Sequence, residues 1–128
     1  MAADTRLDGK VVVVTGAGGG IGRDIALLAG AQGAQVVVND IGASLDGTGN
    51  DRGPAEHVAA EIRAAGGAAA VSTDSVADRE GAQNIIRTAV EAFGRVDGVV
   101  NNAGILRDGF FHKMSDAEFD QVVKVHLY

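Results

Sequence analysis

The sequence contains no cysteine and no tryptophan, and it has only one proline and one tyrosine. Without cysteine the chain can form no disulfide, no thiolate nucleophile and no thiolate metal site. The three histidines, His57, His112 and His126, lack the mutual spacing of metal ligands. We therefore expect no metal site, and a fold that depends on its hydrophobic core.

Basic residues and long apolar runs are also scarce. Eleven basic side chains stand against 17 acidic ones, which gives a formal charge of −6 and argues against a broad surface for nucleic-acid backbones. No run approaches the roughly 18 apolar residues of a membrane span. Residues 1–6 lack the basic-then-apolar order of a secretory signal. We expect a cytoplasmic protein without nucleic-acid or membrane partners.

Glycine, by contrast, is abundant, at 19 of 128 residues, about twice its usual share. Around the glycines, β-branched or small apolar runs alternate with helical patterns. Strands are expected at Val11–Val14 and residues 36–38, and weaker ones at 68–71 and 96–100. Such alternation predicts stacked βαβ units, hence an α/β fold with a parallel sheet and helices on both faces.

Apolar spacings of three and four residues predict the helices between these strands. The three expected faces are Ile21, Ile25 and Leu28; Val58, Ile62 and Ala65; and Ala82, Ile85, Ile86, Ala89, Val90 and Phe93. Gly33, Gly66 and Gly94 stand where these helices should end, and Pro54 where the second should begin. A last helix is expected from Ser115, capped with Glu118, with an apolar stripe of Phe119, Val122, Val123, His126 and Leu127.

The densest glycine cluster lies between the first strand and the first helix. It reads Thr-Gly-Ala-Gly-Gly-Gly-Ile-Gly over residues 15–22. A tight strand-to-helix turn without Cβ atoms lets a pyrophosphate approach the N–H groups of the helix start. Ile21 excludes G-x-G-x-x-G, and Arg23-Asp24 after Gly22 excludes a P-loop. The turn fits both T-G-x-x-x-G-x-G and, through Gly19, T-G-x-x-G-x-x-G.

Two further features of the sequence distinguish between these two glycine-turn patterns. Asn-Asn-Ala-Gly over residues 101–104 follows the fourth strand, and Asp74 follows the third. With the glycine turn, they resemble the short-chain dehydrogenase/reductase family in its shorter branch. The resemblance implies a Rossmann-type sheet of order 3-2-1-4 and a nicotinamide dinucleotide site. It places the cofactor contacts at Gly16, Gly18, Gly20, Ile21, Gly22, Asp40, Asp74, Ser75, Asn101, Ala103 and Gly104.

Asp40 bears on the choice of cofactor. It ends the second strand about 20 residues beyond the glycine turn, where an acid accepts hydrogen bonds from the ribose hydroxyls and repels a 2′-phosphate. No lysine or arginine lies between Gly16 and Gly22. Both observations favour NAD over NADP.

The resemblance extends to a subgroup. Val38-Asn39-Asp40, the glycine-rich segment 42–53, residues 102–108 and Val125-His126-Leu127 are similar to the (3R)-hydroxyacyl-CoA dehydrogenase unit of peroxisomal multifunctional enzyme type 2 and its bacterial relatives. This implies oxidation of a 3-hydroxyacyl-CoA, or of a related secondary alcohol such as a steroid, and allows a peroxisomal location. His126 stands where the family usually has an asparagine.

The family's chemistry also requires a Tyr-x-x-x-Lys pair, which these 128 residues do not contain. By resemblance, the chain is the NAD-binding N-terminal part, residues 1–128, of such a domain and is expected to be inactive alone. The alternative is a non-catalytic nucleotide-binding module. With four strands, the outer edge of the fourth is unprotected, so we expect homo-oligomers or other self-association there.

Overall fold

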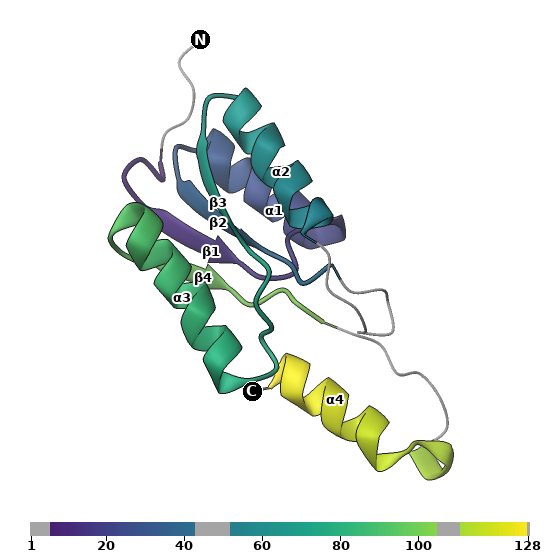
Figure 1. The fold of residues 1–128 in the computed structure, drawn as a ribbon. Coiled ribbons are helices and arrows are strands. Elements are labelled where there is room, and N and C mark those ends of the chain that lie inside the picture. Colours follow the sequence, from purple (N-terminus) through teal and green to yellow (C-terminus); the bar gives the residue numbers. More distant parts are fainter. Residues whose placement is uncertain (1–5, 43–51, 105–110, 128) are drawn as a thin grey trace.

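The computed structural model describes residues 6–42, 52–104 and 111–127. In these residues four parallel strands form one sheet, and helices pack on both of its faces (Figure 1). The strand order is β3-β2-β1-β4, which confirms the expected α/β, Rossmann-type sheet. The elements are β1 (Val11–Val14), α1 (Gly20–Ala31), β2 (Gln35–Asn39), α2 (Gly53–Ala64), β3 (Ala68–Ser72), α3 (Arg79–Phe93), β4 (Gly98–Val100), η1 (Phe111–Lys113) and α4 (Asp116–His126).

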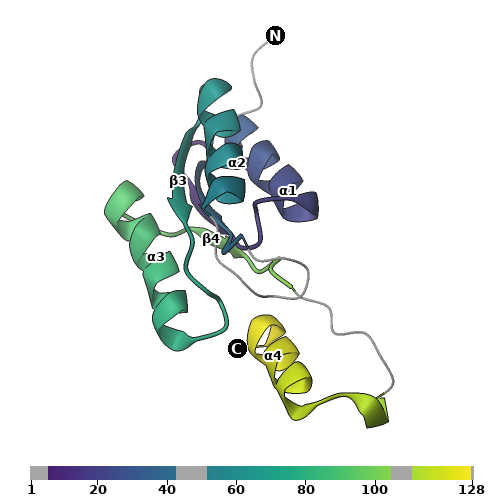
Figure 2. The ribbon, with the colours of Figure 1, turned by 45° about the vertical axis from the view of Figure 1, so that its right-hand side comes forward.

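The two central strands are continuous valine runs because both of their faces are buried. Successive side chains of a strand point to opposite faces. Val36 and Val38 therefore join Val14 in a core beneath α1 and α2. Val37 turns the other way and packs with Val11, Val13 and the α3 residues Ile85 and Ala89. Helices α1 and α2 thus cover one face of the sheet, and α3 covers the other (Figure 2).

Helix α4 stands apart from these layers. It extends away from the sheet in both views (Figures 1 and 2), and none of its residues is buried. The predicted capping box is present, since the Ser115 hydroxyl accepts from the Glu118 backbone N–H and the Glu118 carboxylate accepts from the Ser115 N–H. The predicted apolar stripe is not covered: Phe119 and Leu127 are exposed.

The predicted helix ends agree closely with the structure. Gly33, Gly66 and Gly94 all have positive φ at the ends of α1, α2 and α3. Gly94 is itself the C-cap rather than the residue after it. Pro54 is the second residue of α2 and not the first, because Gly53 precedes it in the helix. A proline in the first turn still loses no hydrogen bond within the helix.

The predicted buried face of α1 is only partly right: Ile25 is half-buried and packs against the core. Ile21 and Leu28 are 73% and 62% exposed, and the buried residues are Gly22, Ala26 and Ala29. The helix turns its small residues toward the sheet and α2, and the larger residues lie to one side. Leu28 lines an open groove beside β4, together with Ile25 and Val99.

The other helical faces are partly right. In α2, Val58 and Ile62 are buried as predicted, but Ala65 is the exposed C-cap. In α3, Ile85 and Ala89 are buried, whereas Ile86 and Val90 are exposed. Only part of the predicted α3 stripe therefore packs against the sheet.

Strand β4 begins two residues later than predicted, at Gly98. Before it, the Asp97 carboxylate Oδ2 accepts a 2.8 Å hydrogen bond from the Val11 N–H, and the Asp97 N–H donates to the Val11 carbonyl at 2.9 Å. The Asp97 side chain thus serves as the acceptor for the Val11 N–H at the start of the β1–β4 pair, where a backbone carbonyl would otherwise accept. The predictions for residues 43–51 and 105–108 lie outside the described residues, and no described helix is long and apolar enough to cross a membrane.

Candidate nucleotide-binding site

All the predicted site segments follow carboxyl ends of strands. The glycine turn follows β1, Asp40 follows β2, Asp74 and Ser75 follow β3, and residues 101–104 follow β4. Because the strands are parallel, these four ends share one edge of the sheet. In open α/β sheets, ligands bind outside this edge.

The glycine turn leaves the start of α1 uncapped. Gly19 is the N-cap, and no side chain of the described residues caps the helix there. The first N–H groups of an α-helix have no partner within the helix and attract anions. Gly20 has φ +56°, and a Cβ atom at Gly19 or Gly20 would meet no atom within 4 Å. The helix start is therefore open to an anionic group.

Two glycines let this turn pack against the segment that follows β4. A Cβ atom on Gly22 would lie 2.4 Å from both the Asn102 side-chain nitrogen and the Gly16 carbonyl oxygen. A Cβ atom on Gly16 would lie 2.8 Å from the Cα atom of Ala103. Such distances leave no room for any side chain. The predicted Gly16, Gly22 and Ala103 are thus in direct contact.

Thr15 and Asn102 fasten the two segments together. The Thr15 hydroxyl accepts the N–H groups of Asn102 and Ala103, both at 3.1 Å, and donates to the Val100 carbonyl at 3.3 Å. In return, the Asn102 amide donates to the carbonyls of Thr15 and Gly16, at 3.1 and 3.2 Å. The segment that follows β4 therefore fixes the shape of the glycine turn that follows β1.

Asp40 lies at the end of β2 with its carboxylate turned toward the glycine turn. Oδ2 accepts the Gly18 N–H at 2.9 Å, and Oδ1 accepts the Gly42 N–H at 2.7 Å. The carboxylate is half-buried and held by two backbone donors. It is fixed next to the turn in which the pyrophosphate is predicted to bind.

Asp74 belongs to a polar cluster that joins the ends of β2 and β3. The buried Asn39 side chain donates to the Ser72 hydroxyl at 3.2 Å and to the Asp74 carbonyl at 2.9 Å. The Ser72 hydroxyl donates to Asp74 Oδ2 at 3.0 Å. Ser75 holds the next turn, because its hydroxyl accepts the Ala77 N–H at 3.0 Å.

The segment after β4 lines a cavity of about 310 Å³ together with α3 and α4. Asn101, Ala103 and His126 are among its lining residues. A Cβ atom on Gly104 would come within 2.6 Å of the His126 ring, so this glycine allows the imidazole to approach the backbone. His126 is exposed rather than part of a core.

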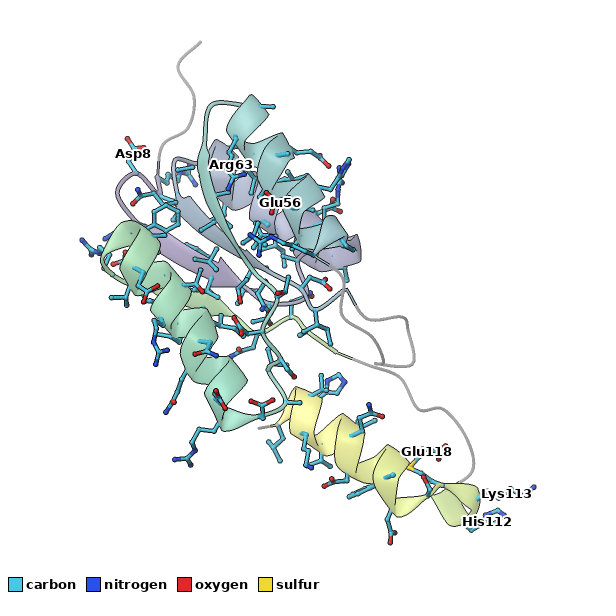
Figure 3. All side chains as sticks on the ribbon, viewed as in Figure 1. Asp8, Glu56, Arg63, His112, Lys113 and Glu118 are labelled. Carbon is cyan, nitrogen blue, oxygen red and sulfur yellow. The ribbon has the colours of Figure 1, made fainter. Side chains whose placement is uncertain are left out.

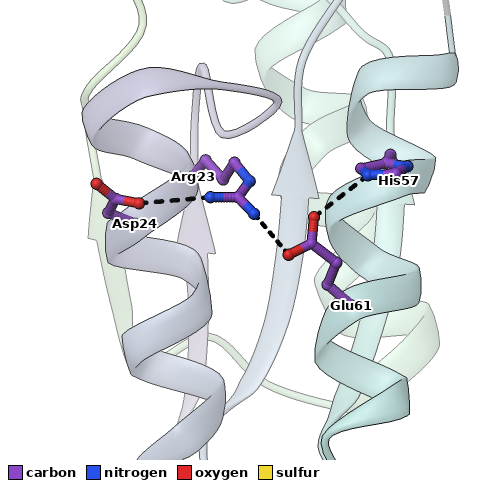
Figure 4. A network of polar contacts seen from close by, with 4 residues as sticks. All are labelled: Arg23, Asp24, His57 and Glu61. Carbon is purple, nitrogen blue, oxygen red and sulfur yellow. Dashed lines mark hydrogen bonds and ion pairs between the residues drawn. The ribbon is translucent and has the colours of Figure 1, made fainter.

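Arg23 is the first basic residue after the glycine turn, and its charge is already paired. Its Nη2 lies 2.6 Å from Glu61 Oε2 of α2, and its Nη1 lies 3.6 Å from Asp24 (Figure 4). The other oxygen of Glu61 faces His57 at 3.4 Å. This network links α1 to α2 behind the turn.

Other charged groups lie away from the site. His112, Lys113 and Glu118 project at the end of α4 that is farther from the sheet, and Glu56 and Arg63 lie on α2 (Figure 3). Within the described residues, no three His, Asp or Glu side chains are grouped as a metal site would require.

Sequence reasoning missed several residues of this edge. Thr15, Asn39, Gly42, Pro54 and Asn102 support the predicted contact residues without having been assigned to the site. Thr15 stands in the glycine turn and Asn102 in the Asn-Asn-Ala-Gly motif, so these two motifs are the signal. Gly42 stands in the glycine-rich segment 42–53 and donates to Asp40 only two residues earlier, whereas the contact of Pro54 with Gly18 has no local signal.

An open helix start on a glycine turn, beside a carboxylate at the end of β2, is the arrangement typical of dinucleotide-binding α/β proteins. The comparisons with known proteins agree. The short chain dehydrogenase family profile matches residues 10–128, so the chain belongs to that family of oxidoreductases, which bind a nicotinamide cofactor.

Individual members of the family show which proteins the chain is similar to. It is 60% identical over 93% of its length to a short-chain type dehydrogenase/reductase of Mycobacterium tuberculosis, of which it covers 42%. It is 50% identical over 99% of its length to peroxisomal multifunctional enzyme type 2 of Mus musculus, of which it covers 17%. The resemblance to this subgroup is confirmed.

Solved structures give the same fold. A short chain dehydrogenase from Mycobacterium avium matches with a TM-score of 0.86 and 55% identity, over 94% of this chain and 43% of that one. A metagenomic short-chain oxidoreductase in complex with NADP matches with a TM-score of 0.80 and 36% identity, over 93% of this chain and 50% of that one. The chain therefore spans half or less of the length of these relatives.

Proposed function

We propose that residues 1–128 form the NAD-binding part of a short-chain dehydrogenase that oxidises a 3-hydroxyacyl-CoA or a related secondary alcohol. The observation that carries this proposal is the juxtaposition of the open α1 start with the clamped Asp40 carboxylate. The first suits a pyrophosphate, and the second suits a ribose with free hydroxyls.

The preference for NAD rests on charge. A 2′-phosphate on the ribose would lie next to the Asp40 carboxylate, and the two negative charges would repel each other. Arg23, the nearest basic residue in sequence to the turn, is paired with Glu61. A related structure holds NADP, so the fold alone does not exclude that cofactor, and we infer that the choice depends on side chains such as these.

NAD supplies the hydride acceptor when it is bound. The residues of this chain would hold and orient it. The first turn of α1 would bind the pyrophosphate, Asp40 the adenosine ribose, and Asp74 and Ser75 would lie beside the adenine. Residues 101–104 would support the other ribose, and His126 would lie near the nicotinamide end through its contact with Gly104.

The substrate class rests on the relatives, among them a multifunctional enzyme of peroxisomes and a hydroxyacyl-CoA dehydrogenase at 42% identity. We propose that hydride transfer requires a Tyr-x-x-x-Lys pair, which this sequence lacks. In the tyrosine-dependent reaction that pair handles the proton of the substrate hydroxyl. Residues 1–128 alone should bind cofactor weakly and show no turnover of 3-hydroxyacyl-CoA.

The test is cofactor binding by the Asp40→Ala variant. Titration calorimetry with NAD and with NADP should show a marked rise in the Kd for NAD and a much smaller change for NADP. Glu91→Ala is a suitable control, since this exposed carboxylate of α3 lies outside the predicted site and its loss changes the charge by the same amount. Equal effects of Asp40→Ala on both cofactors would refute the assignment of the ribose site. Measurable NADH formation from a 3-hydroxyacyl-CoA would refute the predicted inactivity.

A further inference from the structure

Gly18 lies between Asp40 and Pro54, and the space beside its Cα atom is filled from both sides. A Cβ atom there would lie 2.8 Å from Asp40 Oδ2 and 2.7 Å from the Cβ atom of Pro54. Real Cβ atoms do not approach other heavy atoms so closely. Gly18 has no positive φ, so its backbone conformation does not require glycine; its surroundings do.

These contacts surround a hydrogen bond that determines where the carboxylate points. The Gly18 N–H donates to Asp40 Oδ2 at 2.9 Å, and the Gly42 N–H donates to Oδ1 at 2.7 Å. A carboxylate has about four lone-pair positions. Two are used by these backbone donors, which leaves about two for the hydroxyls of a ribose.

We propose that Gly18 is a specificity-determining position, because the absence of a side chain there lets its backbone hold the Asp40 carboxylate in the orientation that accepts a free 2′-hydroxyl. Pro54 closes the other side of the space. Its ring is rigid and is held in the first turn of α2, so a side chain at position 18 would displace the carboxylate instead. This inference rests on the proposed NAD site; it gives Gly18, already an expected cofactor contact, a positioning role and adds Pro54 to the site.

The experiment compares Gly18→Ala with Gly19→Ala in NAD and NADP binding. Gly19 is the matched control: a Cβ atom there meets nothing within 4 Å, and its φ of −168° suits any residue. Gly18→Ala should raise the Kd for NAD about tenfold, the effect of weakening one hydrogen bond to a charged group. The Kd for NADP should change little, so the preference for NAD over NADP becomes smaller. Gly19→Ala should keep the ratio of the two Kd values.

A second readout needs no cofactor. The Gly42 amide donates to the same carboxylate, so its NMR signal should move in Gly18→Ala and stay in place in Gly19→Ala. In an Asp40→Ala background, Gly18→Ala should change the Kd for NAD by less than about twofold, because the coupled partner is gone. If Gly18→Ala alone does not fold, removal of the carboxylate in the double variant should restore folding.

The outcomes separate this inference from the function on which it rests. A wild-type chain that binds neither cofactor overturns both. A wild-type chain that prefers NAD, with an unchanged preference and an unchanged Gly42 signal in Gly18→Ala, overturns only the role of Gly18. Equal losses from Gly18→Ala with and without Asp40, or a double variant that also fails to fold, overturn it as well.

Discussion

Thr15 is the single residue that most directly joins the two motifs of the site. Its buried hydroxyl accepts two backbone N–H groups after β4 and donates to the Val100 carbonyl. Valine has nearly the same shape but would leave the Ala103 N–H unsatisfied, and the Asn102 N–H would keep only its hydrogen bond to the Val100 carbonyl. Such unsatisfied groups are expensive in a folded protein.

We therefore expect Thr15→Val to lower the free energy of unfolding by about 2 kcal/mol and to weaken cofactor binding. Thr88→Val is the control, because the Thr88 hydroxyl only donates to the Asn84 carbonyl one turn earlier in α3, and its loss should cost less than about 0.5 kcal/mol. Urea unfolding of both variants measures the difference. Equal losses would mean that the hydroxyl of Thr15 does not fasten the two segments.

At this scale the sequence is enough to place the predicted contact residues at one sheet edge, but it does not reveal the residues that support them. The glycine turn, Asp40 and residues 101–104 could be assigned to one sheet edge because carboxyl ends of parallel strands meet there. The bonds between Thr15 and Asn102 join residues 87 positions apart. The contact of Gly18 with Asp40 and Pro54 depends on how α2 returns to the turn. Neither follows from local spacing.

Among the elements, the junction of β1 with β4 depends on one carboxylate. Asp97 accepts from the Val11 N–H at 2.8 Å and from Arg95 Nε at 3.1 Å. The hydrogen bond from Arg95, followed by that from Val11, holds the pKa of Asp97 below its ordinary value of 3.8. A carboxyl whose pKa is lower in the folded than in the unfolded chain stabilises the fold above its unfolded pKa. That contribution disappears as pH falls through the folded pKa.

We predict that Asp97→Asn is less stable than the wild-type chain at neutral pH, and that the gap closes only when the pH falls below the ordinary carboxyl range. Urea midpoints for both proteins, measured from neutral pH down to strong acid, give this gap. A gap that is the same at all pH values would show that the charge of Asp97 does not support the start of β4.

Element types and order are also predictable, whereas the buried faces are less so. Valine runs indicate buried strands, and the helical spacings place the four α-helices of the described residues, though not the short η1. In α1, however, Ile21 and Leu28 look like the core face, and the sheet instead receives Gly22, Ala26 and Ala29. Close packing of a helix on a sheet favours small residues, and a hydrophobicity pattern gives these little weight.

For the whole molecule, the described residues leave the outer edge of β4 and the apolar side chains near it without cover. Leu28 and Val99 are 62% and 44% exposed and line one groove beside that edge. Edges and apolar patches of this kind promote association. We propose that residues 1–128 self-associate through this surface.

Sedimentation velocity over a wide range of protein concentration tests this proposal. The wild-type chain should form dimers or larger species, and Val99→Lys should shift it toward the monomer. Val90→Lys, on the exposed side of α3, is the control and should leave the association unchanged. A wild-type chain that is monomeric throughout would contradict the proposal.

The central claim is that the glycine turn, Asp40 and residues 101–104 form one NAD site at the carboxyl edge of the sheet. NMR titration of the labelled chain with NAD tests it most directly. Amide signals of residues 16–22, Asp40 and 101–104 should move together with one Kd, and NADP should move them only at higher concentration. Signals that do not move, or that move only elsewhere in the chain, would contradict the account.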